Sequence, residues 1–280
     1  MSLESITIDS LPAVEALLNY TVPMAQKPRD YAYDPPPGVP HSNSILEPRR
    51  FAIRDMRPVA ARISLDSHGF AAIRHRSAVS GFQDEDEIRR TYYPEAEALL
   101  KEATVAARVL IFDHTIRRHI PGTDDRRNLA RQPAREVHVD QTVKSGPQRV
   151  RDLLPAEAEK LLRGRVQIVN LWRPLHGPVQ DAPLAVCDAL SVAPADLLAS
   201  DLVYRDRIGE TYSVTYNPAH RWFYLPAMTP DEVLLLKCFD SRTDGRARFA
   251  PHSAFTDPTA PPDARPRESI ELRSLVFHPA

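Results

Sequence analysis

The chain has 280 residues and an almost balanced charge, with 36 basic and 37 acidic side chains. A chain without a basic field is not expected to bind nucleic acid or anionic lipid. It also lacks the run of about 18 to 20 apolar residues that a membrane helix needs. Two cysteines without a CxxC spacing, and no apolar run near the N-terminus that resembles a signal sequence, predict a cytoplasmic protein.

Residues 1–48 are expected to form a proline-rich N-terminal arm. Its first part, residues 11–20, has the pattern of a short amphipathic helix, and the proline-rich stretch 31–40 cannot form a helix or a central strand. Such an arm either covers a pocket or a partner chain or is a surface tail, and the sequence favours neither.

Short apolar runs separated by polar or proline-containing breaks predict a β-rich body over residues 49–280. Expected strands cover residues 51–54, 60–65, 69–75, 108–112, 165–174, 184–187, 210–216, 220–224 and 233–239, with 201–207 as a further candidate. Helices are expected at 95–106 and 155–163, because Pro94 and Pro155 are tolerated in a first turn and Gly164 follows the second segment. The body is therefore predicted to be one mainly antiparallel β unit with helices outside it.

His138 and Asp140 are the first part of a candidate metal site. Side chains two residues apart on a strand point to the same side, so an imidazole and a carboxylate would converge. His252 is the expected third ligand, and the chain must fold back as a barrel or sandwich to bring it there. Two histidines and one carboxylate suit a non-haem Fe(II) oxygenase. His114 is a weaker rival, because adjacent residues such as Asp113 and His114 face opposite ways on a strand.

The last strand offers a site for a 2-oxoacid co-substrate such as 2-oxoglutarate. This co-substrate and O2 would both bind to the Fe(II). Arg267, Ser269 and Arg273 share one face of this strand. The planar guanidinium of Arg267 can bind a carboxylate through two parallel hydrogen bonds, assisted by the Ser269 hydroxyl. Arg273 would reach the other carboxylate or the substrate. Asn170 is a polar residue in an apolar row, so it needs a partner, either a ligand or a structural loop.

Six segments occur in the order found in one known family. They cover residues 112–117, 137–142, 169–174, 236–241, 250–255 and 266–273. The chain resembles, over residues 50–278, the AsaB-like hydroxylase/desaturase family of 2-oxoglutarate/Fe(II)-dependent oxygenases, which includes gibberellin desaturase and cephem-methoxylation-related proteins.

This resemblance implies a double-stranded β-helix (jelly-roll, cupin-like) core with flanking helices. It implies iron ligands at His138, Asp140 and His252 and co-substrate binding at Arg267 and Ser269. Asn170, Trp172 and Arg173 would then be pocket residues; we assign Asn170 and Arg273 to the co-substrate and Trp172 and Arg173 to the substrate pocket.

The expected reaction is hydroxylation, desaturation or rearrangement of a small natural product in secondary metabolism. One alternative is a supporting subunit of a heteromeric oxygenase, since some members of the family work in pairs. The chain could form a homodimer or a heterodimer, and the sequence does not decide between them. A methyltransferase is a weaker alternative, because the chain has nine glycines and no G-x-G turn for a nucleoside.

Overall fold

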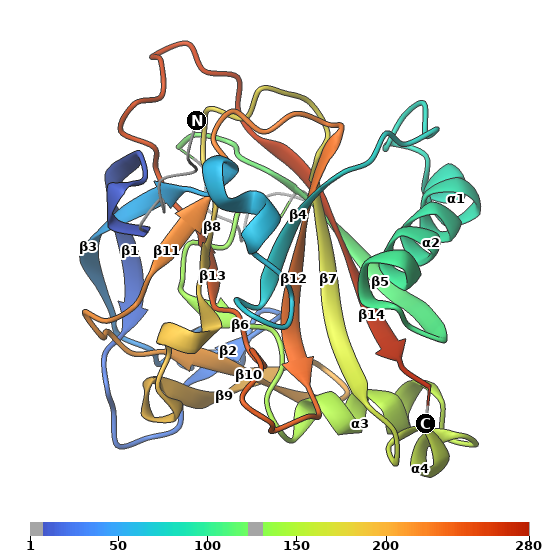
Figure 1. Cartoon of the computed structure of the whole chain (residues 1–280). Coiled ribbons are helices and arrows are strands. Elements are labelled where there is room, and N and C mark those ends of the chain that lie inside the picture. The colour runs from blue at the N-terminus through green and yellow to red at the C-terminus, as the bar shows by residue number, and fades with distance from the viewer. Residues whose placement is uncertain (1–7, 123–130, 280) are drawn as a thin grey trace.

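The structure, a computed structural model, describes residues 8–122 and 131–279. In this part of the chain, nine strands form one curled sheet and five strands form a second sheet (Figure 1). The larger sheet has the order β1 (Ala13–Thr21), β3 (Leu46–Asp55), β11 (Trp222–Tyr224), β8 (Leu184–Cys187), β13 (His252–Ala254), β6 (His138–Val139), β10 (Ile208–Val214), β9 (Leu197–Val203) and β2 (Arg29–Tyr31). The smaller sheet has the order β4 (Phe70–Arg74), β12 (Glu232–Asp240), β7 (Val166–Pro174), β14 (Glu268–Phe277) and β5 (Arg108–Arg118).

The two sheets pack face to face around an apolar core. Trp172 and Leu236 of the smaller sheet contact a cluster that includes Val186 and Phe223 of the larger sheet. Every residue of β7 is buried, because its second face is covered as well. The core is thus closed on both sides of this central strand, and the inner face of β7 points toward the larger sheet.

Helices lie outside the sheets. α1 (Glu85–Glu87) and α2 (Tyr93–Thr104) flank a π-helical turn, η3 (Ile88–Tyr92), on the outer side of β5 and β14 (Figure 1). Leu99 and Leu100 of α2 pack there against Val169 and Leu171. α3 (Ser145–Leu153) and α4 (Ala158–Leu161) lie near the lower ends of β7 and β14 in Figure 1. None of the helices in the described residues is long and apolar enough to span a membrane. The mainly β architecture with flanking helices is confirmed.

The expected helix at residues 11–20 is wrong, because this segment forms β1. Ala16, Leu18 and Tyr20 are buried at every second position, which is the period of a strand. β1 pairs with β3 over nine residues, and β2 pairs with β9. Part of the expected arm is therefore built into the larger sheet, while the division at residue 48 stays a prediction.

Two further expectations differ from the structure. Residues 60–65 were expected to be a strand, but the 3-10 helix η2 (Arg57–Arg62) covers the first part of this segment. Pro58 lies in its first turn, and the helix ends before Ile63. No helix was expected between residues 106 and 155, but α3 begins at Ser145. Gly146 allows this helix to pack closely, since a Cβ at that position would lie 2.6 Å from the Phe239 ring.

Candidate metal centre

Three side chains with the chemistry of metal ligands converge between the two sheets. β6 carries His138 and β13 carries His252, and these residues lie directly opposite each other in an antiparallel pair. Asp140 follows two residues after His138 and lies on the same side. One ligand atom of each of the three residues lies within 4.8 Å of the other two. In the described part of the chain, no other group of three such residues meets this criterion.

Both imidazoles are held by backbone carbonyl groups. His138 donates from Nδ1 to the carbonyl oxygen of Glu136 at 2.8 Å, and His252 donates from Nδ1 to that of Ala250 at 3.1 Å. A proton fixed on Nδ1 leaves the lone pair on Nε2. Each histidine is therefore prepared to coordinate a metal through Nε2.

The Asp140 carboxylate is oriented by a second layer of hydrogen bonds. Its Oδ2 accepts from Asn170 Nδ2 at 2.8 Å and from Arg273 Nε at 3.1 Å. Its Oδ1 lies 3.4 Å from His138 Nε2. Although burial opposes the charge, Arg273 and the two imidazoles hold the pKa of Asp140 well below its ordinary value. Oδ2 of the ionised carboxylate thus accepts both hydrogen bonds, and Oδ1 is available to bind a cation.

Glu271 completes this arrangement. It accepts from Asn170 Nδ2 at 3.1 Å and lies 3.1 Å from Arg273 Nη2. Asn170 and Arg273 were predicted to bind the co-substrate; in the structure both donate hydrogen bonds to Asp140, and their role toward the co-substrate stays a prediction. The polar residue in an apolar row thus has the carboxylate of a candidate metal ligand as its partner. Among the described residues, Asn170 Oδ1 remains buried without a hydrogen-bond partner.

Ser269 of β14 and the preceding Arg267 lie at one end of the inner wall, which is the face of the smaller sheet that points toward the larger sheet. Arg267 is 1% exposed and donates from Nη1 to the carbonyl oxygen of Ala182 at 2.6 Å. Within the described residues, its Nε and the Ser269 hydroxyl are buried without a partner, and no carboxylate forms an ion pair with this guanidinium. Burial, together with the neighbouring Arg117, lowers the pKa of Arg267 to about 9. These free donors fit the carboxylate of a dicarboxylic co-substrate.

Trp172 and Arg173 lie on opposite faces of β7. Trp172 packs in the core between the sheets, and its ring centroid lies 5.4 Å from the Arg267 guanidinium. Arg173 points outward, where it donates to the Tyr92 hydroxyl at 2.8 Å and to the carbonyl oxygen of His75 at 2.8 Å. Because neighbouring strand residues alternate, the structure does not bring Arg173 to the metal group, and its expected place in the substrate pocket stays a prediction.

His114 also lies away from the candidate ligands. It contacts the Tyr93 hydroxyl at 2.9 Å, and its Nε2 lies 3.1 Å from Glu85. Both partners belong to the helical layer outside the smaller sheet. The sequence argument against His114 as a ligand agrees with this position.

Comparison with known proteins identifies the family. The family model of the oxidoreductase/YMDC permease-like domain matches residues 18–277. The hydroxylase/desaturase efuI of Hormonema carpetanum is 38% identical over 80% of this chain and 82% of its own length. The chain belongs to the hydroxylase/desaturase family of 2-oxoglutarate/Fe(II)-dependent oxygenases. The resemblance noted in the sequence is thereby confirmed.

A second relative links this oxygenase to a solved structure. The Fe(II)/2-oxoglutarate-dependent dioxygenase nvfI of Aspergillus novofumigatus is 32% identical over 88% of the chain and 90% of its own length. The structure of the iron and alpha-ketoglutarate-dependent endoperoxidase NvfI superposes with a TM-score of 0.86, at 29% identity over 96% of this chain and 99% of that one. The expected double-stranded β-helix fold is confirmed.

Sequence reasoning gave no role to two residues of the oxygenase on the inner wall, Glu271 and Arg117. Glu271 lies between Ser269 and Arg273 in the period-two pattern of β14, and this spacing could have identified it. Arg117 lies opposite Ser269 on β5. That signal becomes visible only when the strand register is known.

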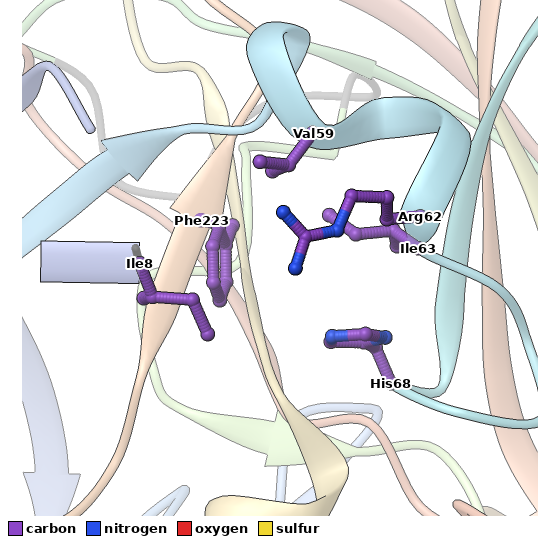
Figure 2. A pocket seen from close by; sticks show the side chains of 6 residues that line it. All are labelled: Ile8, Val59, Arg62, Ile63, His68 and Phe223. Carbon is purple, nitrogen blue, oxygen red and sulfur yellow. The ribbon is translucent and has the colours of Figure 1, made fainter. Parts of the chain in front are cut away.

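Two cavities lie away from the metal group. Figure 2 shows a cavity of about 80 Å³ lined by Ile8, Val59, Arg62, Ile63, His68 and Phe223. It is small beside the roughly 300 to 1,000 Å³ of ordinary ligand sites. A second cavity, of about 320 Å³, includes Arg173 and His176 in its lining. Neither is lined by one of the three candidate ligands.

Proposed function

We propose that His138, Asp140 and His252 hold the Fe(II) of this oxygenase, and that Arg267 and Ser269 bind the distal carboxylate of 2-oxoglutarate. The observation that carries the proposal is a buried guanidinium, without an ion-pair partner among the described residues, between the same two sheets that bring together two imidazoles and one carboxylate. A buried cation is costly without a counter-ion. A bound dicarboxylate would supply that counter-ion.

Fe(II) and 2-oxoglutarate together supply the oxidising power of the family, using O2 and releasing succinate and CO2. The protein's part is to bind and orient. Asn170 and Arg273 hold Asp140 by one oxygen, which leaves the other to face the two imidazoles. Trp172 covers the Arg267 guanidinium with its ring, so water is kept from one side of the proposed carboxylate site.

We propose a small natural product as the substrate, to be hydroxylated, desaturated or rearranged. The relatives named hydroxylase/desaturase and endoperoxidase support this class of reaction. The complete ligand set favours turnover by this chain over a purely supporting role, and neither the family nor the site favours a methyltransferase. Cytoplasmic location, dimer formation and the absence of a nucleic-acid partner stay predictions.

The test is succinate formation from 2-oxoglutarate by purified protein with Fe(II), ascorbate and a panel of candidate natural products. The proposal predicts succinate that requires both Fe(II) and O2, and its loss in Arg267→Met. Arg265→Met is the matched control, because Arg265 is exposed two residues earlier on the same segment. Equal succinate formation by Arg267→Met and wild type would refute the assignment of Arg267.

A further inference from the structure

Arg117 lies in the same inner wall as the proposed co-substrate site. Its register partner across β5 and β14 is Ser269, and directly paired residues project from the same face of a sheet. The next pair on this face joins Thr115 to Glu271. Arg117 therefore lies beside the Ser269 hydroxyl, at the end of the wall where Arg267 is found.

Among the described residues, Arg117 has no ion-pair partner. Its guanidinium donates from Nη1 to the carbonyl oxygen of Gln132 at 2.7 Å. Burial lowers the pKa of Arg117; the charges of Glu271 and Asp140 oppose this shift, and those of Arg273 and Arg131 add to it. The guanidinium thus stays in a partly buried position that disfavours its charge.

The other charges of the wall are already matched. Arg273 lies against Asp140 and Glu271, each at 3.1 Å. Arg267 is assigned above to the distal carboxylate of 2-oxoglutarate. No carboxylate of the described residues forms an ion pair with Arg117, although Glu271 acts on its charge from further along the same face. A cation held out of water is stabilised most by a hydrogen-bonded anion.

We propose that Arg117 is a second carboxylate-binding residue of the active site, and this proposal rests on the proposed function. The carboxylate belongs either to 2-oxoglutarate, shared with Arg267 and Ser269, or to the natural-product substrate. Both sources present the same chemistry to the planar fork of a guanidinium. In the second case the oxygenase selects substrates that carry a carboxylic acid.

The first arm of the test measures co-substrate binding without turnover. Calorimetry of the Mn(II)-loaded enzyme with 2-oxoglutarate, and with its analogue N-oxalylglycine, compares wild type with Arg117→Gln. If the co-substrate is the source, Arg117→Gln weakens binding roughly 10- to 100-fold, as the loss of a charge-assisted hydrogen bond does. Arg117→Lys, which keeps the charge, restores part of the affinity.

The second arm keeps the co-substrate site saturated with N-oxalylglycine. The enzyme is then titrated with apolar monocarboxylates such as decanoate and 1-adamantanecarboxylate, and with the corresponding primary amides. If the substrate is the source, the wild type binds the acids and not the amides, and Arg117→Gln loses this preference while its affinity for 2-oxoglutarate is unchanged.

Arg118→Gln is the matched control in both arms. Arg118 is the next residue on β5, faces the other way, and binds Gln83 and Glu268 at the surface. Unchanged 2-oxoglutarate binding in Arg117→Gln, together with no acid preference in the wild type, overturns the proposal. Failure of the wild type to bind 2-oxoglutarate would instead refute the site itself. Melting temperature and Mn(II) binding show whether each variant folds, and Arg117→Lys carries the test if Arg117→Gln does not.

Discussion

Arg267→Met should stabilise the ligand-free protein while removing its affinity for 2-oxoglutarate. The pKa of Arg267 falls from the ordinary arginine value to about 9, and at about 1.4 kcal/mol per unit this corresponds to a cost on the order of 5 kcal/mol for keeping the buried guanidinium charged. The hydrogen bond to Ala182 and the contact with Trp172 are already made in this state. Even buried ion pairs are often neutral or stabilising by about 1 to 4 kcal/mol when apolar residues of similar volume replace them, so we expect a gain of about this size when the unpaired guanidinium is replaced by methionine.

The size of this stabilisation depends on pH. The folded-state pKa of Arg267 lies below the unfolded value, so the folded protein holds this proton less tightly. The cost is fully present below about pH 9 and declines as the pH rises from there toward the ordinary pKa of arginine. At neutral pH, Arg267→Met should therefore show its whole benefit to the free energy of unfolding.

The assay is urea unfolding of the metal-free protein, followed by calorimetric titration with 2-oxoglutarate after Mn(II) is added. We expect a higher unfolding midpoint and a loss of affinity of at least about 30-fold, since removing one partner of a buried charge pair costs about 2 to 5 kcal/mol. Arg265→Met should change neither quantity. A variant that is less stable and binds 2-oxoglutarate normally would refute the reasoning.

Three further changes test other parts of the structure. Asn170→Ala should weaken Fe(II) binding about 10- to 100-fold, because it frees Asp140; an unchanged dissociation constant from metal titration would show that the amide does not orient the ligand. Arg173→Met should lower the free energy of unfolding by about 2 to 4 kcal/mol through lost buried hydrogen bonds, while metal and 2-oxoglutarate affinities measured by calorimetry stay at wild-type values; a selective loss of binding would contradict its outward position. The pKa of Asp240 is lowered, despite burial, by Arg165 and Lys237, so its contribution to stability is present above the ordinary carboxyl pKa and lost as the pH falls through the lowered value. Acid unfolding should therefore show a smaller pH dependence in Asp240→Asn, and equal slopes would argue against this ion pair.

Local spacing was enough to predict part of the site. His138 and Asp140 are two residues apart, so one strand places both on one side, and the same rule groups Arg267, Ser269 and Arg273. The position of His252 opposite His138 depends on the pairing of β6 with β13, which no local pattern reveals.

The partners of Arg273 and Asn170 required the tertiary structure. Sequence reasoning identified Asn170 as a polar group that needs a partner, but its partners come from distant parts of the chain: Asp140, which follows β6 of the larger sheet, and Glu271 of the neighbouring strand β14. The segment 11–20 was misassigned for a related reason: its apolar residues fit a helical period as well as a strand period. Only the pairing of β1 with β3 decides between them.

The most direct test of the metal centre is an anaerobic Fe(II) titration in the presence of 2-oxoglutarate, followed by the visible absorption that forms when the co-substrate chelates the metal. Wild type and His114→Ala should bind one equivalent of Fe(II) and develop this absorption. His138→Ala and His252→Ala should lose it while remaining folded by circular dichroism. Retention of full absorption by either ligand variant, or its loss in His114→Ala alone, would contradict the assignment of the three ligands.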